Sequence, residues 1–122
     1  NNQCVLVRRD SGEKVVVSLD RLETEIPVLL DAVSTSLFQK AAARRDQMTY
    51  TADNLDDMIK LAEEKPGFIK AMWCGDRECE EKLKELTGVS SRCMPFEQNA
   101  HSDKCVCCGK PAEKLVYWGK AY

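Results

Sequence analysis

Residues 73–79, Trp-Cys-Gly-Asp-Arg-Glu-Cys, and residues 105–109, Cys-Val-Cys-Cys-Gly, hold cysteines in the pattern C-x4-C-x25-C-x2-C. Four thiolates from two distant segments can saturate tetrahedral zinc, and such closed sites supply folding energy, not chemistry. Gly109 lets the backbone turn back under the metal and aim its N–H groups at sulfur. The pattern therefore predicts a structural Zn2+ site with the ligands Cys74, Cys79, Cys105 and Cys108.

The remaining thiols and the single histidine leave alternatives for the ligand set. Cys107 could replace Cys108, because either C-x-C or C-x2-C could supply the second pair of ligands; we prefer Cys108 because Gly109 follows it directly. His101 could serve if Cys79 did not, although we expect this loop histidine to be solvated. Cys4 and Cys93 are most simply small buried hydrophobes.

Length and composition set broad limits. The 122 residues can form one ordinary domain or two small ones, and 43% hydrophobic with 31% charged residues suits a soluble globular protein. No apolar run approaches the roughly 18 residues of a membrane span, and no secretory signal is visible. Seven cysteines, an odd number, without such a signal favour a reducing compartment, with metal ligation in place of disulfides.

The charge pattern does not point to nucleic acid. The net charge is −2 and neither half of the chain is a strongly basic patch, so we do not expect the main RNA contact surface of a larger protein here. Arg44 and Arg45 are expected to complement a helix C-terminus. Lysines near the end of the chain are expected to be ordinary surface residues: Lys110, Lys114 and Lys120.

The first part of the chain predicts a β-hairpin followed by helices. Residues 4–8 and 14–18 are valine-rich strands, and the turn between them contains a glycine that can take positive φ. Asp20 and Glu23 resemble a capping box, and Pro27 suits the start of a longer helix through about residue 47. Its apolar positions predict one buried stripe: Leu29, Leu30, Val33, Leu37 and Ala41. A further helix is expected over 53–64, capped by Asp53 or Asn54.

The second part predicts a small α+β domain around the metal. A strand over 68–73 delivers Cys74, a helix over 76–87 places Cys79 in its first turn, and Gly88 ends that helix. Strands are expected over 89–94 and 115–118, with a polar loop over 96–104 between them. We therefore expect an α+β chain with domains 1–65 and 66–122, the second built on antiparallel strands and stapled by the metal.

Three stretches resemble a known family, the prolyl-tRNA synthetases of the archaeal/eukaryotic type. N-N-Q-C-V-L-V-R-R-D-S-G-E-K at the start is similar to the last hairpin of their anticodon-binding domain, an α/β domain. W-C-G-D-R-E-C-E-E-K-L-K-E-L-T-G-V-S-S-R-C-M-P-F looks like the start of their C-terminal zinc-binding domain. K-C-V-C-C-G-K-P-A-E-K-L-V-Y-W-G-K-A-Y looks like the end of that domain.

The resemblance implies a class II aminoacyl-tRNA synthetase, an enzyme that activates proline with ATP and Mg2+ and ligates it to tRNA(Pro). It implies a cytoplasmic homodimer with the catalytic and most of the anticodon-binding domains upstream, so this segment holds no catalytic residue and is inert alone. Zinc ligation carries over to Cys74, Cys79, Cys105 and Cys108. The carboxylate of Tyr122 is implied to approach the active site of its own subunit.

Two other interpretations stay open. The chain could be an independent zinc module that binds a protein or RNA partner, but this must explain an isolated hairpin over 4–18, which is marginal in water. Residues 105–108 could be a thiol redox centre. Redox chemistry favours a thiolate at a helix N-terminus, whereas this segment continues into Gly109 and Pro111.

Overall fold

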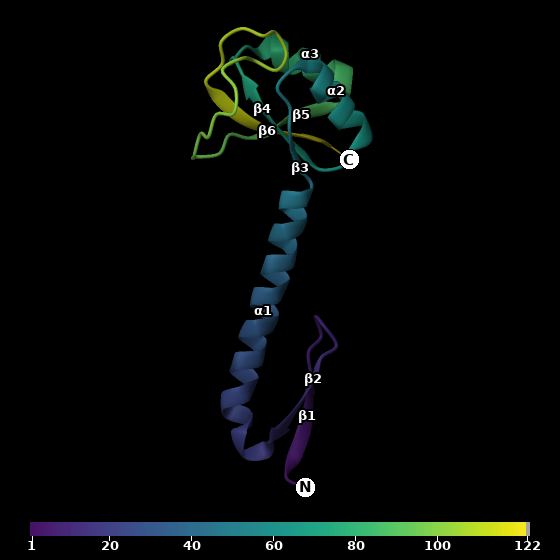
Figure 1. Cartoon of the computed structure of the whole chain (residues 1–122), viewed down its shortest axis with the longest axis vertical. Helices are drawn as coiled ribbons and strands as arrows, with labels where there is room; N and C mark the ends of the chain where they lie inside the picture. The colour runs from purple at the N-terminus through teal and green to yellow at the C-terminus, as the bar shows by residue number, and fades with distance from the viewer. Residues whose placement is uncertain (122) are drawn as a thin grey trace. The chain divides into compact units, whose positions relative to one another are not determined.

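The computed structural model describes residues 1–121 of an α+β chain that divides into two compact units, residues 1–44 and residues from 45 onward. Figure 1 shows the helices and strands in chain order. The first unit holds a two-stranded sheet, and the second holds a four-stranded sheet in the order β3-β4-β6-β5. Within the described residues, no helix is long and apolar enough to cross a membrane.

The hairpin predicted at the start of the chain is confirmed. Strand β1 (Gln3–Val7) pairs antiparallel with β2 (Lys14–Ser18). The turn closes through a hydrogen bond of 2.8 Å from the Gly12 N–H to the Arg8 carbonyl, and Gly12 takes a φ of 74°. The Arg8 guanidinium bonds the Asp10 carboxylate at 2.8 Å, and this bond lowers the pKa of Asp10 to about 2.

Helix α1 (Leu22–Gln47) begins earlier than predicted. A short 3-10 helix, η1 (Leu19–Arg21), contains Asp20 and leads directly into α1, so the expected capping box and the start at Pro27 are both wrong. Pro27 lies inside the helix. Proline has no backbone N–H, so the helix lacks one hydrogen bond at this position. The loss is small because Pro27 lies close to the start of the helix, where few such bonds are made.

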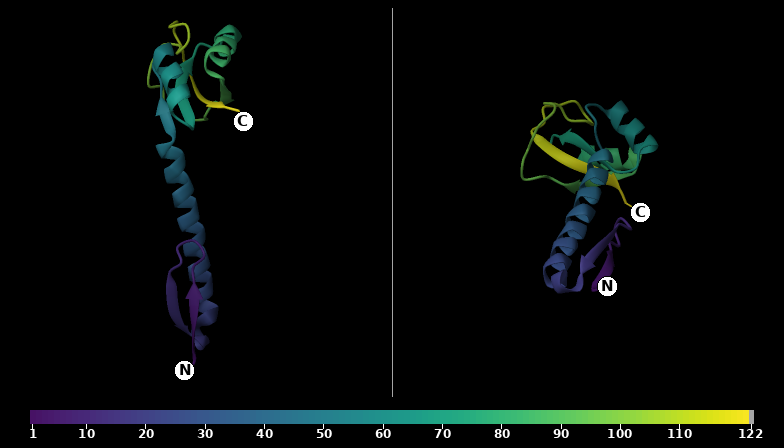
Figure 2. Two further views of the ribbon diagram at one scale, coloured as in Figure 1. Left: turned by 90° about the vertical axis from the view of Figure 1, so that its right-hand side faces the viewer. Right: turned by 60° about the horizontal axis from the view of Figure 1, so that its bottom comes forward.

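The buried stripe predicted along this helix is also wrong, because α1 has no buried residue. Leu29 and Val33 are half-buried and line a hollow together with Leu6 and Val7 of the hairpin, which runs alongside this part of the helix (Figure 2). Three other positions of the stripe are exposed: Leu30, Leu37 and Ala41. Two strands are too narrow to cover the apolar face of a helix of 26 residues.

The second unit is built on a mixed sheet. Strand β4 (Phe68–Trp73) pairs antiparallel with β6 (Lys114–Lys120), and β6 pairs antiparallel with β5 (Val89–Cys93). These are the three predicted strands, although β6 is longer at both ends. Strand β3 (Thr49–Thr51) was not predicted and runs parallel to β4. Three residues that directly follow a helix carry too little periodicity to be recognised as a strand.

The two helices of this unit end where predicted but begin two and one residues later, respectively. Asn54 caps α2 (Leu55–Glu64) by accepting a hydrogen bond of 2.8 Å from the Asp57 N–H. Asp76 caps α3 (Arg77–Thr87) in the same way through the Glu78 N–H at 3.0 Å. Gly88 ends α3 with a φ of 72°, in the left-handed conformation that glycine adopts at least cost.

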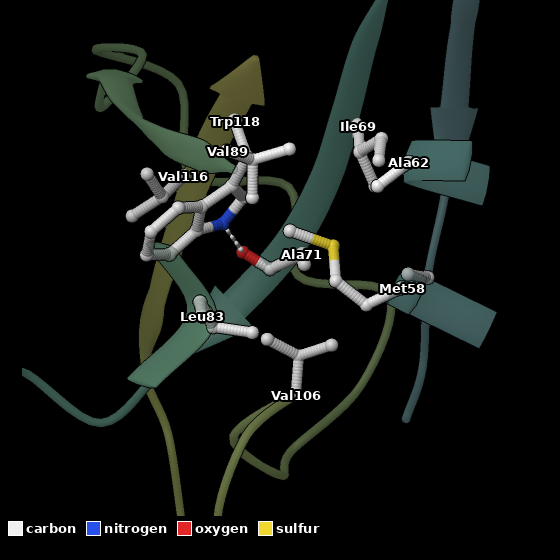
Figure 3. Close-up of a cluster of buried hydrophobic side chains, with 10 residues drawn as sticks. Met58, Ala62, Ile69, Ala71, Leu83, Val89, Val106, Val116 and Trp118 are labelled. Carbon is white, nitrogen blue, oxygen red and sulfur yellow. Dashed lines mark hydrogen bonds between the residues drawn. The ribbon is translucent and has the colours of Figure 1, made fainter. Parts of the chain in front are cut away.

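One face of the sheet forms the core. Met58 and Ala62 of α2 and Leu83 of α3 pack on the side of the sheet that carries Ala71 and Trp118 (Figure 3). The Trp118 indole N–H donates to the Ala71 carbonyl at 3.4 Å, so the polar atom of this buried ring has a partner. The helices therefore cover one face of the sheet.

A glutamine side chain completes the ladder where β5 ends. The Leu115 N–H donates to Oε1 of Gln98 at 2.6 Å, and Nε2 of Gln98 donates to the Leu115 carbonyl at 3.2 Å. The side-chain amide of Gln98 thus takes the place of a strand residue opposite Leu115. It also attaches the predicted loop over 96–104 to the sheet.

We predict that Gly67→Ala destabilises the second unit severely, by roughly 3 kcal/mol or more. Gly67 has a φ of 125°, and a Cβ atom there would lie 2.0 Å from the Met48 backbone oxygen. Urea unfolding of the zinc-loaded chain measures the effect. Gly88→Ala is the matched control, because Gly88 also has positive φ but its nearest neighbour would be a flexible lysine carbon at 3.8 Å; about 1 kcal/mol is expected. Equal losses in the two variants would contradict the steric argument.

Candidate metal centre

The corner between β4 and α3 carries the first two thiols. Cys74 follows the last residue of β4, and Gly75 turns the chain with a φ of 90°. The cap at Asp76 then starts α3, which places Cys79 in its first turn as predicted. The Trp73 indole N–H donates to the Asp76 carbonyl at 3.0 Å and fixes this corner.

A tight knuckle carries the other two thiols. The Cys105 N–H donates to the Lys110 carbonyl at 2.8 Å, and the Gly109 N–H donates back to the Cys105 carbonyl at 2.9 Å. Gly109 has a φ of 71°, as the predicted turn requires. The Val106 N–H donates to the Met72 carbonyl at 2.9 Å, so the knuckle is held on β4 beside the first pair of thiols.

The four sulfur atoms of Cys74, Cys79, Cys105 and Cys108 all lie within 4.8 Å of one another. The Sγ atom of Cys74 is 3.7 Å from that of Cys79 and 3.9 Å from that of Cys108. Four sulfurs at the usual zinc–sulfur bond length of about 2.3 Å form a tetrahedron with edges of about 3.8 Å. None of the four is in a disulfide. The cluster is consistent with a structural metal such as zinc.

The alternative ligands lie outside this cluster. Cys107 is half-buried and packs against the apolar clusters of the core. His101 lies in an exposed loop, but its side chain is only 22% exposed, with Nε2 3.3 Å from the Ala52 carbonyl oxygen and 3.4 Å from the Asp53 carboxylate, so it is less solvated than expected. Cys4 is half-buried, and Cys93 is exposed at the end of β5, so the expectation that Cys93 is buried is wrong.

Burial and backbone dipoles set the acidity of these thiols in opposite directions. Burial raises the pKa of Cys74, Cys79 and Cys107, because a thiolate loses its hydration there. Burial acts in the same sense on Cys105, but hydrogen bonds from the backbone of Cys108, Cys107 and Cys74 outweigh it and lower the pKa of Cys105 to about 7. The knuckle therefore stabilises a thiolate at Cys105.

Lys114 is exposed, as expected for a surface lysine, but it also contacts the corner between β4 and α3. The Lys114 ammonium lies 5.5 Å from the centre of the Trp73 ring, and a Cβ atom at Gly75 would be 2.9 Å from its nitrogen. This cation therefore lies next to the Trp73 ring and to Gly75, the residue that follows Cys74. Its place depends on the pairing of Trp73 with Lys114 across β4 and β6, which spacing along the chain does not reveal. Tyr122, the other predicted functional residue, lies outside the described residues.

Comparisons with known proteins agree on one family. Residues 55–122 match the family model described as "Prolyl-tRNA synthetase, C-terminal". The chain is 64% identical over 122 residues to a proline–tRNA ligase of Clostridium novyi, an alignment that covers 100% of this chain and 26% of that protein. It is 62% identical over 121 residues to a proline–tRNA ligase 2 of Bacillus cereus, covering 99% of this chain and 25% of the relative.

A solved structure agrees with these sequence matches. The crystal structure of the prolyl-tRNA synthetase from Cryptosporidium parvum, complexed with L-proline and AMP, is 31% identical to this chain with a TM-score of 0.89. The match covers 99% of this chain and 26% of that one. The chain thus spans about a quarter of the length of the relatives it matches.

We predict that the affinity for Zn2+ falls steeply as the pH falls. Burial raises the pKa of Cys74 and Cys79, so both thiols hold protons that a metal ion must displace. Each proton that the metal displaces lowers the affinity about tenfold for each unit by which the pH falls, so two such thiols lower it by at least about 100-fold. Below about pH 7 the Cys105 thiol is also protonated and lowers the affinity further. Competition with a chromogenic chelator at pH 6, 7 and 8 measures the affinity. Equal affinities at pH 6 and pH 8 would rule out thiol ligation.

Proposed function

Because this chain belongs to the prolyl-tRNA synthetase family, we propose that it is the C-terminal region of an enzyme that ligates proline to tRNA(Pro) with ATP and Mg2+. The complete enzyme would be a cytoplasmic class II synthetase that works as a homodimer. Its catalytic domain and most of its anticodon-binding domain would lie in the three quarters of the relatives that this chain does not cover. The chain alone would then have no ligase activity.

The observation that carries this proposal is the extent of the similarity. A relative named proline–tRNA ligase aligns with 100% of this chain at 64% identity. An independent zinc module that shared only the metal-binding half would be similar over that half alone. The division into domains 1–65 and 66–122 stays a prediction, and so does the approach of the Tyr122 carboxylate to the active site.

We further propose that the four clustered thiols bind one Zn2+ ion with a structural role. Support comes from the two sulfur–sulfur distances of 3.7 and 3.9 Å, which match the edge of a zinc–sulfur tetrahedron, and from the backbone hydrogen bonds that favour a thiolate at Cys105. Four protein ligands leave zinc no position for a substrate or water, which is typical of a structural site. When bound, the ion would supply Coulombic attraction that joins the β4–α3 corner to the knuckle.

The free energy involved is large enough to decide whether the second unit folds. Structural zinc sites bind with about 10–16 kcal/mol at neutral pH, whereas a whole domain is stable by only about 5–15 kcal/mol. The cluster of apolar residues nearest the metal is small and includes two of the thiols themselves: Met72, Cys79, Cys105, Ala112 and Leu115. We therefore expect the metal to dominate the stability of this end of the unit.

We predict that Cys74→Ser removes zinc and unfolds the second unit, whereas Cys93→Ser retains one zinc per chain. Cys74 belongs to the cluster and Cys93 is exposed outside it. Cys107→Ser and Cys108→Ser form a matched pair of neighbours, of which only Cys108→Ser should lose the metal. Zinc content by atomic emission and folding by circular dichroism are the measurements. Zinc loss in Cys107→Ser with retention in Cys108→Ser would overturn the proposed ligand set.

We predict that the full-length protein exchanges pyrophosphate with ATP only when proline is present, and that it charges tRNA(Pro). The same assays on the 122-residue chain should give no activity, because the catalytic domain would lie in the part of the relatives that this chain does not cover. Alanine and cysteine serve as control amino acids of similar size. A full-length protein that folds and binds zinc but shows no proline-dependent exchange would overturn the proposed enzymatic function.

A further inference from the structure

The face of the second sheet that lies opposite the helices has an uncovered end. Side chains alternate along β4 and β6, so Ile69, Ala71 and Trp118 point into the core while Phe68, Lys70 and Tyr117 point to the other side. Near the metal this second side is covered, because Met72 and Leu115 are buried beneath Cys105 and Ala112. At the opposite end Phe68 is 41% exposed, and a hollow of about 740 Å³ opens over it.

Two aromatic rings form the base of this hollow. The rings of Phe68 and Tyr117 come from the paired strands β4 and β6, with centroids 6.5 Å apart and planes at 75° to each other. Gly119 lies beside both the Phe68 ring and the Arg92 side chain, since a Cβ atom there would be 3.4 Å from the ring and 3.6 Å from the arginine, in ordinary contact with each. The strands thus hold an accessible ring on a rigid support, an arrangement that can stack with a planar base.

Cations surround the rings. Arg45, Lys70 and Arg92 line the hollow together with the carboxylate of Asp46. Arg45 forms an ion pair with Asp46 at 3.1 Å. The Arg92 guanidinium donates to the Gly119 carbonyl at 3.2 Å, which places its charge next to Phe68 and leaves other donors for a ligand. The hollow therefore carries net positive charge in a chain whose overall charge is −2.

We propose that this hollow binds an unpaired segment of tRNA, with a base stacked on Phe68 and phosphates held by Lys70 and Arg92. The partner rests on the proposed function, which makes tRNA the nucleic acid this protein would meet. The chemistry rests on the hollow itself. Sheet-borne aromatic side chains beside Lys and Arg form a common arrangement for single-stranded RNA, whereas the centres of protein–protein interfaces are depleted of lysine.

Direct binding tests the hollow in the 122-residue chain. A fluorescein-labelled single-stranded RNA of mixed sequence is titrated with the zinc-loaded chain, and anisotropy gives Kd. Phe68→Leu should weaken binding about tenfold or more, because one stacked base is lost. Lys70→Gln/Arg92→Gln should also weaken it, and should reduce the slope of log K against log salt by about 1.4, or about 0.7 per phosphate.

Matched variants outside the hollow control for general effects. Phe96 is a fully exposed aromatic residue and Lys84 is an exposed cation on α3, so Phe96→Ala and Lys84→Ala should bind as the unaltered chain does. Zinc content is checked for every variant to exclude misfolding. A blunt RNA duplex should bind more weakly than the single strand. Equal binding of duplex and single strand, or an unchanged Kd for Phe68→Leu, would overturn the proposal.

Kinetics of the full-length protein separate this proposal from the proposed enzyme function. Lys70→Gln/Arg92→Gln should raise KM for tRNA about tenfold in charging assays, with kcat unchanged. It should leave proline-dependent pyrophosphate exchange without tRNA unchanged. Failure of exchange in the unaltered protein would refute the enzyme function. Normal exchange with the same KM for tRNA in the variant would refute only the RNA contact.

The reactivity of the Cys93 thiol, which lines the hollow, can be used to test what occupies the hollow. Cys93 is exposed and lines the hollow, so a maleimide should modify it in the zinc-loaded full-length protein, and tRNA should slow that reaction. Cys93→Ser identifies the modified site by mass spectrometry. Protection of Cys93 before any tRNA is added would show that another part of the protein, or a second protein, covers the hollow, and would overturn the proposal.

Discussion

Four thiols within 4.8 Å of one another impose the strongest constraint on the second unit, because four thiolates so close together would repel one another unless a cation were shared between them. Much of the local structure has the effect of bringing them together. Strand β4 ends at the first thiol, the Asp76 cap directs the second back towards it, and the knuckle over 105–109 hydrogen-bonds to the same strand. The sheet order β3-β4-β6-β5 places these pieces on a central strand, where the backbone has least freedom to move.

The two faces of this sheet differ in how far they are buried. One face forms the core that stabilises the unit, and the other is accessible to a ligand. The face under α2 and α3 is filled by buried apolar side chains, including Trp118, whose indole finds a carbonyl partner. The other face is covered only at the end near the four thiols. Because neighbouring side chains of β4 point to opposite faces of the sheet, Ala71 lies in the core and Lys70 lines the accessible hollow. Rigid packing on one side holds the groups on the other side in place.

Local signals in the sequence predicted the elements that depend on local physics. The hairpin, a cap at Asp53 or Asn54, the left-handed Gly88 and the four clustered cysteines all follow from residue type and spacing. The extent of α1 and the burial of its apolar stripe did not follow, because they depend on what packs against the helix. Strand β3 was missed since its three residues gain stability only from pairing with β4. The position of Lys114 over Trp73 and the cationic hollow both arise from strand register, which neither spacing along the chain nor a net charge of −2 reveals.

The side-chain amide of Gln98 has a consequence for association between molecules. Strand β5 stops opposite Tyr117, so the next N–H and C=O groups of β6 would otherwise be available to an extended segment from a neighbouring molecule. Gln98 occupies both groups of Leu115 through its own donor and acceptor. The side chain of Gln98 thereby blocks this part of the edge of β6 from pairing with a strand of another molecule, which is a route to aggregation.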